Sequence, residues 1–341
     1  MKRIQGKEPV EDMERSQRGN VGEPVTELIS RIRPHRKIEG HSAVLLPFDA
    51  AGKIQFDELA AHVRRTAQAG LGPAVNMDTG YVNLLTDEER RQVLTVTREA
   101  LGPGKSFIAG AFIEGKEGDP VSLYRREIDQ IRSFGGTPII FQCSAMKGFS
   151  SGELVDLYRR VAQDNGPLIA FELGEMFAPF GSIWSEEVAR GIMEIPEIVG
   201  FKHSSLDRRI EWSRLALRDQ VRPEFKIYTG NDLAIDMVMY GSDYLLGLST
   251  FAPETFALRD RLWEQGDGRF YQVNDCLQYL GEFAFRRPTP AYKHSAAQFL
   301  NLRGWISTDR AHPKSPTRPE SDKEILQLIL ERVEHILTSW A

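Results

Sequence analysis

Residues 43–75 read AVLLPFDAAGKIQFDELAAHVRRTAQAGLGPAV, and this stretch contains the unit from which the fold can be predicted. An apolar run at residues 43–46 is followed by a polar turn, an amphipathic segment at residues 56–69 and a second apolar run at residues 72–75. Short continuous apolar runs are typical of parallel strands that are buried on both faces. The stretch therefore predicts a strand, a helix and a second, parallel strand.

The same pattern returns along the chain. Further apolar runs occupy residues 106–109, 138–141, 168–171, 198–201, 225–228 and 244–247, and predicted helices include residues 87–100, 122–134 and 151–164. Eight strand–helix units in about 220 residues match a (β/α)8 barrel, or TIM barrel, in number and size. The predicted fold class is therefore α/β. A doubly wound open sheet is the rival fold. It would favour a Gly-x-Gly-x-x-Gly turn after the first strand, whereas residues 47–52 read PFDAAG.

Two further segments flank this repeat. Residues 1–38 are polar and charge-mixed, apart from Val25, Leu28, Ile29 and Ile32, and form either a mobile or partner-docking extension or an ordered arm on the barrel or a neighbouring subunit. After Pro253 the pattern is purely helical, over residues 254–264, 269–285, 290–302 and 322–339. We therefore expect an N-terminal extension over 1–38, a barrel over 39–260 and a C-terminal helical subdomain over 261–341.

Composition narrows the class of protein. Hydrophobic residues make up 41% and charged residues 27%, as in soluble globular proteins, and the net charge of -5 does not favour nucleic acid or an anionic membrane. Cys143 and Cys276 are too few for a disulfide framework and lack metal-ligand spacing, which fits a reducing cytoplasm. The charged first residues do not form a secretory signal, and no apolar run approaches the ~20 residues of a membrane span.

The residues after strand six, Gly200-Phe201-Lys202-His203, offer the clearest candidate for chemistry, because the carboxyl ends of barrel strands form the active site. A lysine that closes a buried strand is costly as a cation, so it must be paired, neutral or exposed at the barrel mouth. A neutral amine can attack a ketone to give an imine. The bland alternative is a lysine that reaches solvent or pairs with a carboxylate.

A second candidate stretch, Asn76-Met77-Asp78-Thr79-Gly80-Tyr81, follows strand two. A threonine and a glycine in a tight strand-to-helix turn present a hydroxyl and backbone N–H groups, which suit a carboxylate. Downstream, Thr86 and Glu89 have the spacing of a capping box that opens the next helix.

Together the two stretches resemble the dihydrodipicolinate synthase and N-acetylneuraminate lyase family. In that family strand two ends in Gly-Thr-Thr-Gly-Glu, and strand six ends in Ile-x-Gly-x-Lys, whose lysine forms an imine. Here residues 77–81 read MDTGY and residues 198–202 read IVGFK, and weaker similarities occur at residues 228–232, 241–253 and 288–293. The resemblance covers roughly residues 40–303. It implies a barrel, an imine-forming Lys202 and a homo-oligomer.

The sequence also departs from the family. The family's strand-five tyrosine, which relays protons, aligns with Phe171; the arginine that follows it is missing until Arg190; and the first threonine of the strand-two motif is Asp78. Imine chemistry then needs another acid or base. The candidates at strand ends are Asp78, which we rank first, then Tyr81 and Glu172, and last His203. Structural roles are the alternative for each of them.

We therefore expect a Schiff-base lyase (an aldolase) or a dehydratase that acts on a 2-oxo acid or a sugar-acid substrate. No metal or organic cofactor is implied, since carboxylates and histidines do not cluster at ligand spacing. The alternative is a catalytically silent or non-imine barrel that binds a small oxo acid or sugar acid. The residues expected to bind substrate are Thr79, Gly80, Ser144, Phe171, Asn231 and Ser249.

Overall fold

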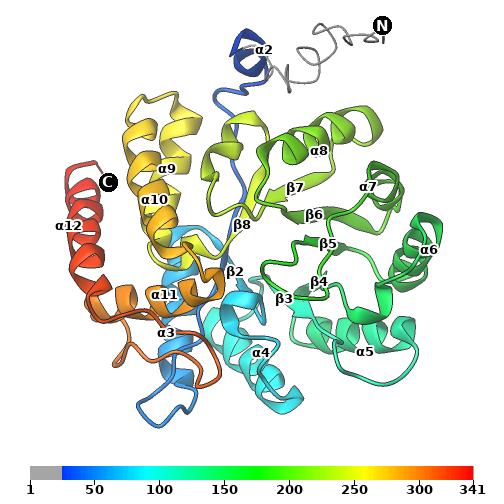
Figure 1. Cartoon of the computed structure of the whole chain (residues 1–341), viewed down its shortest axis with the longest axis horizontal. Coiled ribbons are helices and arrows are strands. Elements are labelled where there is room, and N and C mark those ends of the chain that lie inside the picture. The colour runs from blue at the N-terminus through cyan, green and yellow to red at the C-terminus, as the bar shows by residue number, and fades with distance from the viewer. Residues whose placement is uncertain (1–24, 341) are drawn as a thin grey trace, which may run out of the picture.

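Eight parallel strands close into a barrel surrounded by helices in the computed structural model, which describes residues 25–340 (Figure 1). Each strand pairs with its neighbours in sequence, and the first pairs with the eighth. The predicted (β/α)8 class is confirmed. The strands are β1 (Gly40–Ala43), β2 (Gly72–Val75), β3 (Phe107–Ala111), β4 (Gly136–Ile140), β5 (Leu168–Leu173), β6 (Ile198–Ser204), β7 (Lys226–Thr229) and β8 (Asp243–Leu246).

The prediction for the first strand is shifted. Strand β1 ends at Ala43, where the predicted run begins. After that residue the Leu45 N–H no longer joins the sheet, because it donates to the Thr250 hydroxyl at 3.0 Å. The apolar residues 44–46 remain buried in the turn that follows. An apolar run therefore does not by itself mark the residue at which this strand ends.

Helices occupy the connections between the strands and the C-terminal part of the chain. Two of them begin with capping boxes, formed by Thr86 with Glu89 and by Ser150 with Glu153, which satisfy free N–H groups at the helix start. The α-helices are α2 (Val25–Ser30), α3 (Phe56–Ala69), α4 (Asp87–Leu101), α5 (Pro120–Ser133), α6 (Ser151–Ala162), α7 (Glu186–Met193), α8 (Arg208–Val221), α9 (Pro253–Gln265), α10 (Arg269–Ala284), α11 (Tyr292–Leu302) and α12 (Asp322–Trp340). Short 3₁₀ helices are η1 (Asp78–Gly80), η2 (Ser144–Met146), η3 (Ile235–Tyr240), η4 (Leu248–Thr250) and η5 (Thr289–Ala291).

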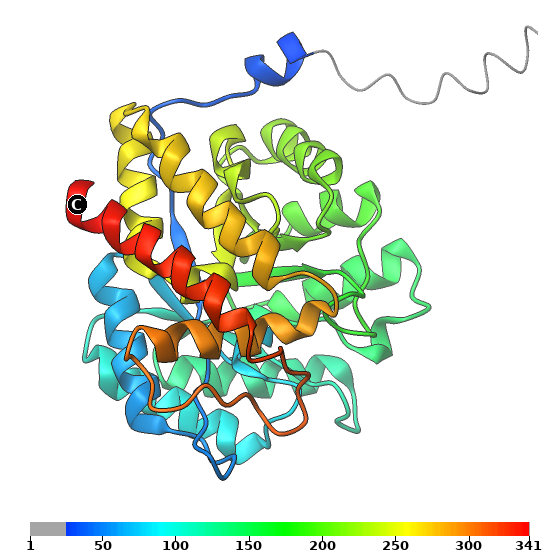
Figure 2. The same cartoon turned by 60° about the vertical axis from the view of Figure 1, so that its left-hand side comes forward.

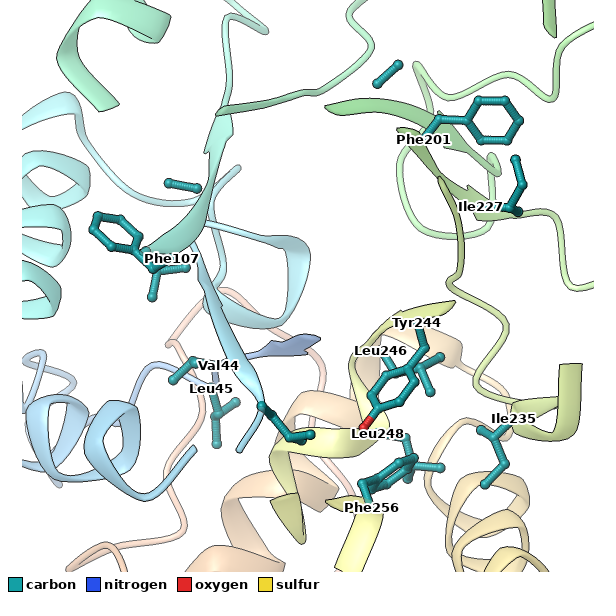
Figure 3. Packing of buried hydrophobic residues seen from close by; sticks show 14 of the residues in the cluster. Val44, Leu45, Phe107, Phe201, Ile227, Ile235, Tyr244, Leu246, Leu248 and Phe256 are labelled. Carbon is teal, nitrogen blue, oxygen red and sulfur yellow. The ribbon is translucent and has the colours of Figure 1, made fainter. Parts of the chain in front are cut away.

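Alternation along the strands divides the buried residues into two layers. Phe171 of β5 and Tyr228 of β7 belong to a cluster inside the barrel, while their strand neighbours Ala170 and Ile227 belong to the layer between strands and helices. Figure 3 shows part of this outer layer, with Tyr244 of β8 beside Phe256 of α9, their ring centroids 5.7 Å apart. The same alternation decides which polar residues can reach the interior of the barrel.

The chain ends pack on the barrel in different ways. Figure 2 shows α12 lying along the other C-terminal helices, and it contacts α9, α10 and α11. At the opposite end of the described chain, the N–H of Arg33 donates to the Met239 carbonyl at 2.7 Å and Arg36 pairs with Asp243 at 2.6 Å. This part of the predicted extension is thus an ordered arm on its own barrel, while residues 1–24 lie outside the described residues. Within residues 25–340, no helix is both long and apolar enough to cross a membrane.

Candidate active site

A narrow pocket lies at the carboxyl ends of strands β2, β5, β6, β7 and β8, where this fold places its chemistry. Its lining combines two carboxylates, three hydroxyls, one amine and several apolar side chains. The lining residues are Asp78, Thr79, Phe171, Leu173, Phe177, Lys202, Ser204, Gly230, Asp232, Gly247 and Tyr292.

Lys202 is the only amine among these lining residues, and its side chain reaches the pocket from the interior face of β6. Its residue is 8% exposed, and its Nζ lies 4.6 Å from the centroid of the Phe171 ring. Burial lowers the pKa of Lys202 to about 8, although the negative charges of Asp232 and Asp78 oppose this shift. About one amine in ten is then neutral at pH 7, against roughly one in several thousand for an ordinary lysine.

Glycine at position 230 makes room for this amine. A Cβ at that position would lie 2.5 Å from Lys202 Cε and would also overlap the Ser204 hydroxyl. Lys202 and Ser204 therefore share one small space beside the β7 turn, and a larger residue at position 230 would force both side chains to move.

Asp78 and Thr79 meet the C-terminal helices at the other side of the pocket. The Tyr292 hydroxyl donates to Asp78 Oδ2 at 2.9 Å and lies 2.8 Å from the Thr79 hydroxyl. The Lys293 ammonium donates to Asp78 Oδ1 at 3.0 Å. The first two residues of α11 thus complete a polar cluster that begins in the turn after β2.

Asp232 follows β7 and is a second carboxyl group in the pocket. Burial raises its pKa to about 7, against the stabilising effects of the Leu248 N–H, which donates to it at 2.7 Å, and of the Lys202 charge. Close to neutral pH this group can therefore hold or release a proton.

Phe171 occupies the position that faces the amine from the neighbouring strand. It pairs in register with Lys202 in the β5–β6 ladder, and both side chains point into the barrel. The space next to Lys202 is therefore filled by a ring without a hydroxyl. Among the described residues that line the pocket there is also no arginine.

The structure does not bring Glu172 or His203 to the pocket, which corrects their place among the acid/base candidates. Each follows an interior residue in its strand, so both side chains lie in the outer layer. There Glu172 pairs with His203 Nδ1, accepts from Arg214 Nη2 at 2.7 Å and accepts from the Trp184 N–H at 2.9 Å. All of these partners are buried, and the arrangement is a structural ion-pair network.

Tyr81 also lies outside the pocket lining. Its ring packs edge-on against Phe48, with centroids 5.4 Å apart, and lies 5.8 Å from the His312 ring of the C-terminal segment. The residue is buried by its own chain. Burial raises the pKa of its phenol well above the usual value, which makes ionisation unfavourable.

Of the residues expected to bind substrate, the structure places Thr79 and Phe171 in the lining and four outside it. The Gly80 N–H donates to Met77 O at 3.0 Å within its own turn, so it is not free for a carboxylate. Ser144 donates to Glu114, Asn231 accepts from the Leu233 N–H, and Ser249 donates to the Leu246 carbonyl. These contacts lie in the loops that follow β3, β4, β7 and β8.

The lining also contains polar residues that the sequence did not single out. Asp232 and Tyr292 occur in stretches that already resembled the family, residues 228–232 and 288–293, and this was the available signal for them. Ser204 could have been found by alternation, because it stands two residues after Lys202 on the same face of β6.

Within the described residues, no group of three or more histidine, cysteine, aspartate or glutamate side chains could hold a metal ion.

The sequence is similar to those of known synthases. The 4-hydroxy-tetrahydrodipicolinate synthase of Parasynechococcus marenigrum is 24% identical over 282 residues, covering 81% of this chain and 88% of the relative. That of Kosmotoga olearia is 27% identical over 217 residues, covering 62% and 70%. The resemblance inferred from the motifs is confirmed by these matches.

Solved structures show the same fold. Dihydrodipicolinate synthase from Thermotoga maritima has a TM-score of 0.74 at 20% identity, covering 87% of this chain and 99% of that structure. A prophage protein of the dihydrodipicolinic acid synthase family from E. coli K12, solved in complex with pyruvate, has a TM-score of 0.75 at 17% identity, covering 87% and 98%.

The profile of one family matches residues 41–326, which include the whole barrel and most of the C-terminal helices. At low identity the chain is also similar to dihydrodipicolinate synthases. This protein therefore belongs to the family described as "Protein of unknown function (DUF993)".

Proposed function

We propose that this protein is a Schiff-base lyase that acts on a 2-oxo acid, with Lys202 as the residue that forms the imine. The observation that carries the proposal is a buried amine with a pKa near 8 at the carboxyl end of a barrel strand. The names of the relatives support it, since they are synthases of one barrel family and one related structure holds pyruvate.

The proposed chemistry begins with attack of neutral Lys202 Nζ on the ketone carbon of the substrate. A proton donated to the hydroxyl of the resulting carbinolamine lets water leave and gives a protonated imine, which withdraws electrons from the neighbouring carbon–carbon or carbon–oxygen bond. Asp232 can exchange a proton during dehydration because its pKa is close to neutral. We assign the Ser204 hydroxyl to the substrate carboxylate in place of Gly80, whose N–H is engaged in its own turn.

Trapping tests the proposal. Pyruvate and a panel of other 2-oxo acids are incubated with the protein and borohydride, which reduces an imine to a stable secondary amine, and the intact mass is measured. We expect one adduct per chain for wild type, none for Lys202→Gln, and an unchanged adduct for the control Lys226→Gln. Lys226 is suitable because it pairs with Asp243 at 2.9 Å in a different strand and does not line the pocket. Tight binding of an oxo acid without any adduct would favour the non-imine alternative.

We also expect that the reaction is not that of an ordinary dihydrodipicolinate synthase. That family relays protons through a strand-five tyrosine and helps to hold its substrate with an arginine, whereas here Phe171 faces Lys202 and the described pocket lining contains no arginine. A coupled assay with pyruvate and aspartate semialdehyde should show no robust turnover. Rapid product formation by wild type would show that the loss of the strand-five tyrosine and of the arginine does not change the reaction.

A further inference from the structure

Tyr292 is a buried phenol at the start of α11, and it lines the pocket together with Phe171 of β5. Its ring stacks on Phe285, with centroids 4.1 Å apart and planes inclined by 14°. A Cβ at Gly247 would lie 3.0 Å from Tyr292 Cε2 and 3.1 Å from the Thr79 hydroxyl, so the glycine leaves this ring and this hydroxyl open to the pocket. The position of the phenol is therefore fixed by packing on one side while its oxygen remains beside the reaction space.

Hydrogen bonding orients the single proton of this phenol. Its hydroxyl is 2.9 Å from Asp78 Oδ2 and 2.8 Å from the Thr79 hydroxyl. A carboxylate can only accept, so Tyr292 donates to Asp78 and Thr79 donates to Tyr292. The result is an ordered chain of three groups that ends on a carboxylate, and that carboxylate also pairs with Lys293.

These contacts make Tyr292 competent to give up its proton while it receives another. Asp78 is the acceptor, Lys293 balances its charge on the side away from the pocket, and Lys202 and Asp232 are the other charged groups in the lining. Burial and the charge of Asp78 raise the pKa of the phenol well above its usual value. A free phenolate is thus unfavourable, and proton entry and exit must be coupled.

We propose that Tyr292 is the catalytic acid/base residue of this site, working with Asp78 in place of the missing strand-five tyrosine. The inference rests on the proposed imine at Lys202. In pyruvate bound to Lys202, the C3–H bond breaks and its electron pair forms a C2–C3 double bond, while the electrons of the protonated C2–N double bond move onto nitrogen. The C3 proton passes to the Tyr292 oxygen as the phenol's own proton passes to Asp78 Oδ2. The reverse steps return a proton from Asp78 through Tyr292 to C3.

Exchange of the pyruvate methyl hydrogens in D₂O measures this step directly. Wild type, Tyr292→Phe and the control Tyr158→Phe are each incubated with pyruvate, and the loss of the methyl signal is followed by proton NMR. Tyr158 is a matched control because it is also buried, but it lies on α6 away from the pocket, and its hydroxyl has no hydrogen-bond partner among the described residues. We expect Tyr292→Phe to slow exchange by ~10²–10⁴-fold, with Tyr158→Phe close to wild type.

Imine trapping separates this inference from the proposed function. Tyr292→Phe keeps the ring that stacks on Phe285, so it should still reach the wild-type extent of borohydride adduct at Lys202 after long incubation. Exchange at the wild-type rate in Tyr292→Phe would overturn the inference, as would a wild type that forms the adduct but exchanges no methyl hydrogen. Absence of any adduct in wild type would instead overturn the proposed function.

Asp78→Asn provides a second test of the same chain of groups. If Tyr292 and Asp78 act as one unit, the single variants should lose similar factors, and the double variant should lose little more than either one. Losses that multiply in the double variant would show two independent roles and would contradict the coupled transfer.

Discussion

Single residues decide what the pocket can do. Lys202 and Phe171 are neighbours in the barrel interior, and two glycines, Gly230 and Gly247, keep the space next to the amine and the Tyr292 phenol open. Burial moves the pKa of Lys202 and the pKa of Asp232 toward each other, to about 8 and about 7. One amine and one carboxyl group are therefore both able to change protonation near neutral pH.

Gly230→Ala should abolish imine formation without unfolding the protein. The added Cβ would lie 2.5 Å from Lys202 Cε and would overlap Ser204, so the amine must leave its place. We expect the borohydride adduct with pyruvate to fall below a tenth of the wild-type extent. The control Gly152→Ala places a methyl group on α6 where nothing lies within 4 Å, and it should trap normally. An unchanged adduct in Gly230→Ala would mean that Lys202 reaches the ketone from another direction.

At the scale of elements, strand periodicity explains what the sequence could and could not predict. Seven of the eight strands fall where continuous apolar runs occur, and Glu172 faces away from the interior because it follows Phe171. The partners of Asp78 could not be predicted in this way. Tyr292 is 214 residues distant from Asp78 in sequence, and only the packing of α11 against the mouth of the barrel brings them together. The pairing of Arg214 with Glu172 could not be predicted either, because it depends on how α8 packs against the barrel.

The network around Glu172 predicts a large loss of stability on Glu172→Gln. Removing one partner of a buried ion pair leaves uncompensated charge, here on Arg214, and typically costs ~3–5 kcal/mol. Urea denaturation should show this decrease, while the exposed control Glu175→Gln should change the free energy of unfolding by less than ~0.5 kcal/mol. Folded Glu172→Gln should still form the adduct at Lys202. A stable but inactive variant would contradict the structural role.

The pH dependence of this difference follows from the pKa of Glu172. Burial alone would raise that pKa, but His203 and Arg214 together lower it below its ordinary value of 4.5. The ionised network therefore contributes its full stabilisation above pH 4.5 and loses it as pH falls through the lower, folded-state pKa. The difference in unfolding free energy between wild type and Glu172→Gln should therefore shrink below about pH 4.

The whole molecule couples the barrel to its C-terminal helices. Helix α12 packs on α9, α10 and α11, and α11 contributes Tyr292 to the pocket and Lys293 to Asp78 (Figure 2). Arg318 lies in the segment before α12 and donates hydrogen bonds to the carbonyls of Ala284 and Pro288. These bonds connect that segment to the turn that precedes α11. The C-terminal helices therefore help to form the candidate site. Assembly into a homo-oligomer remains a prediction, which analytical ultracentrifugation can test.

Leu330→Ala tests this coupling. Leu330 is buried in α12, and its truncation should lower the free energy of unfolding by ~2–5 kcal/mol. Leu328, two residues earlier, is 61% exposed, so Leu328→Ala should change it by less than ~0.5 kcal/mol. If barrel and C-terminal helices unfold as one unit, amides of β5 should also exchange hydrogen faster in Leu330→Ala. Faster exchange limited to α12 would show that the helices unfold on their own.

The central claim is that Lys202 is a buried, partly neutral amine that forms an imine with a 2-oxo acid. Site-resolved trapping tests it most directly: pyruvate and cyanoborohydride are added at pH values from 6 to 10, and the adduct on each lysine-containing peptide is measured by mass spectrometry. The adduct should appear on Lys202, with an initial rate that rises about tenfold per pH unit below pH 8 and levels off above it, because only the neutral amine attacks. An adduct on another lysine with Lys202 unmodified, or a rate at Lys202 that still climbs through pH 10 as for an ordinary lysine, would contradict the claim.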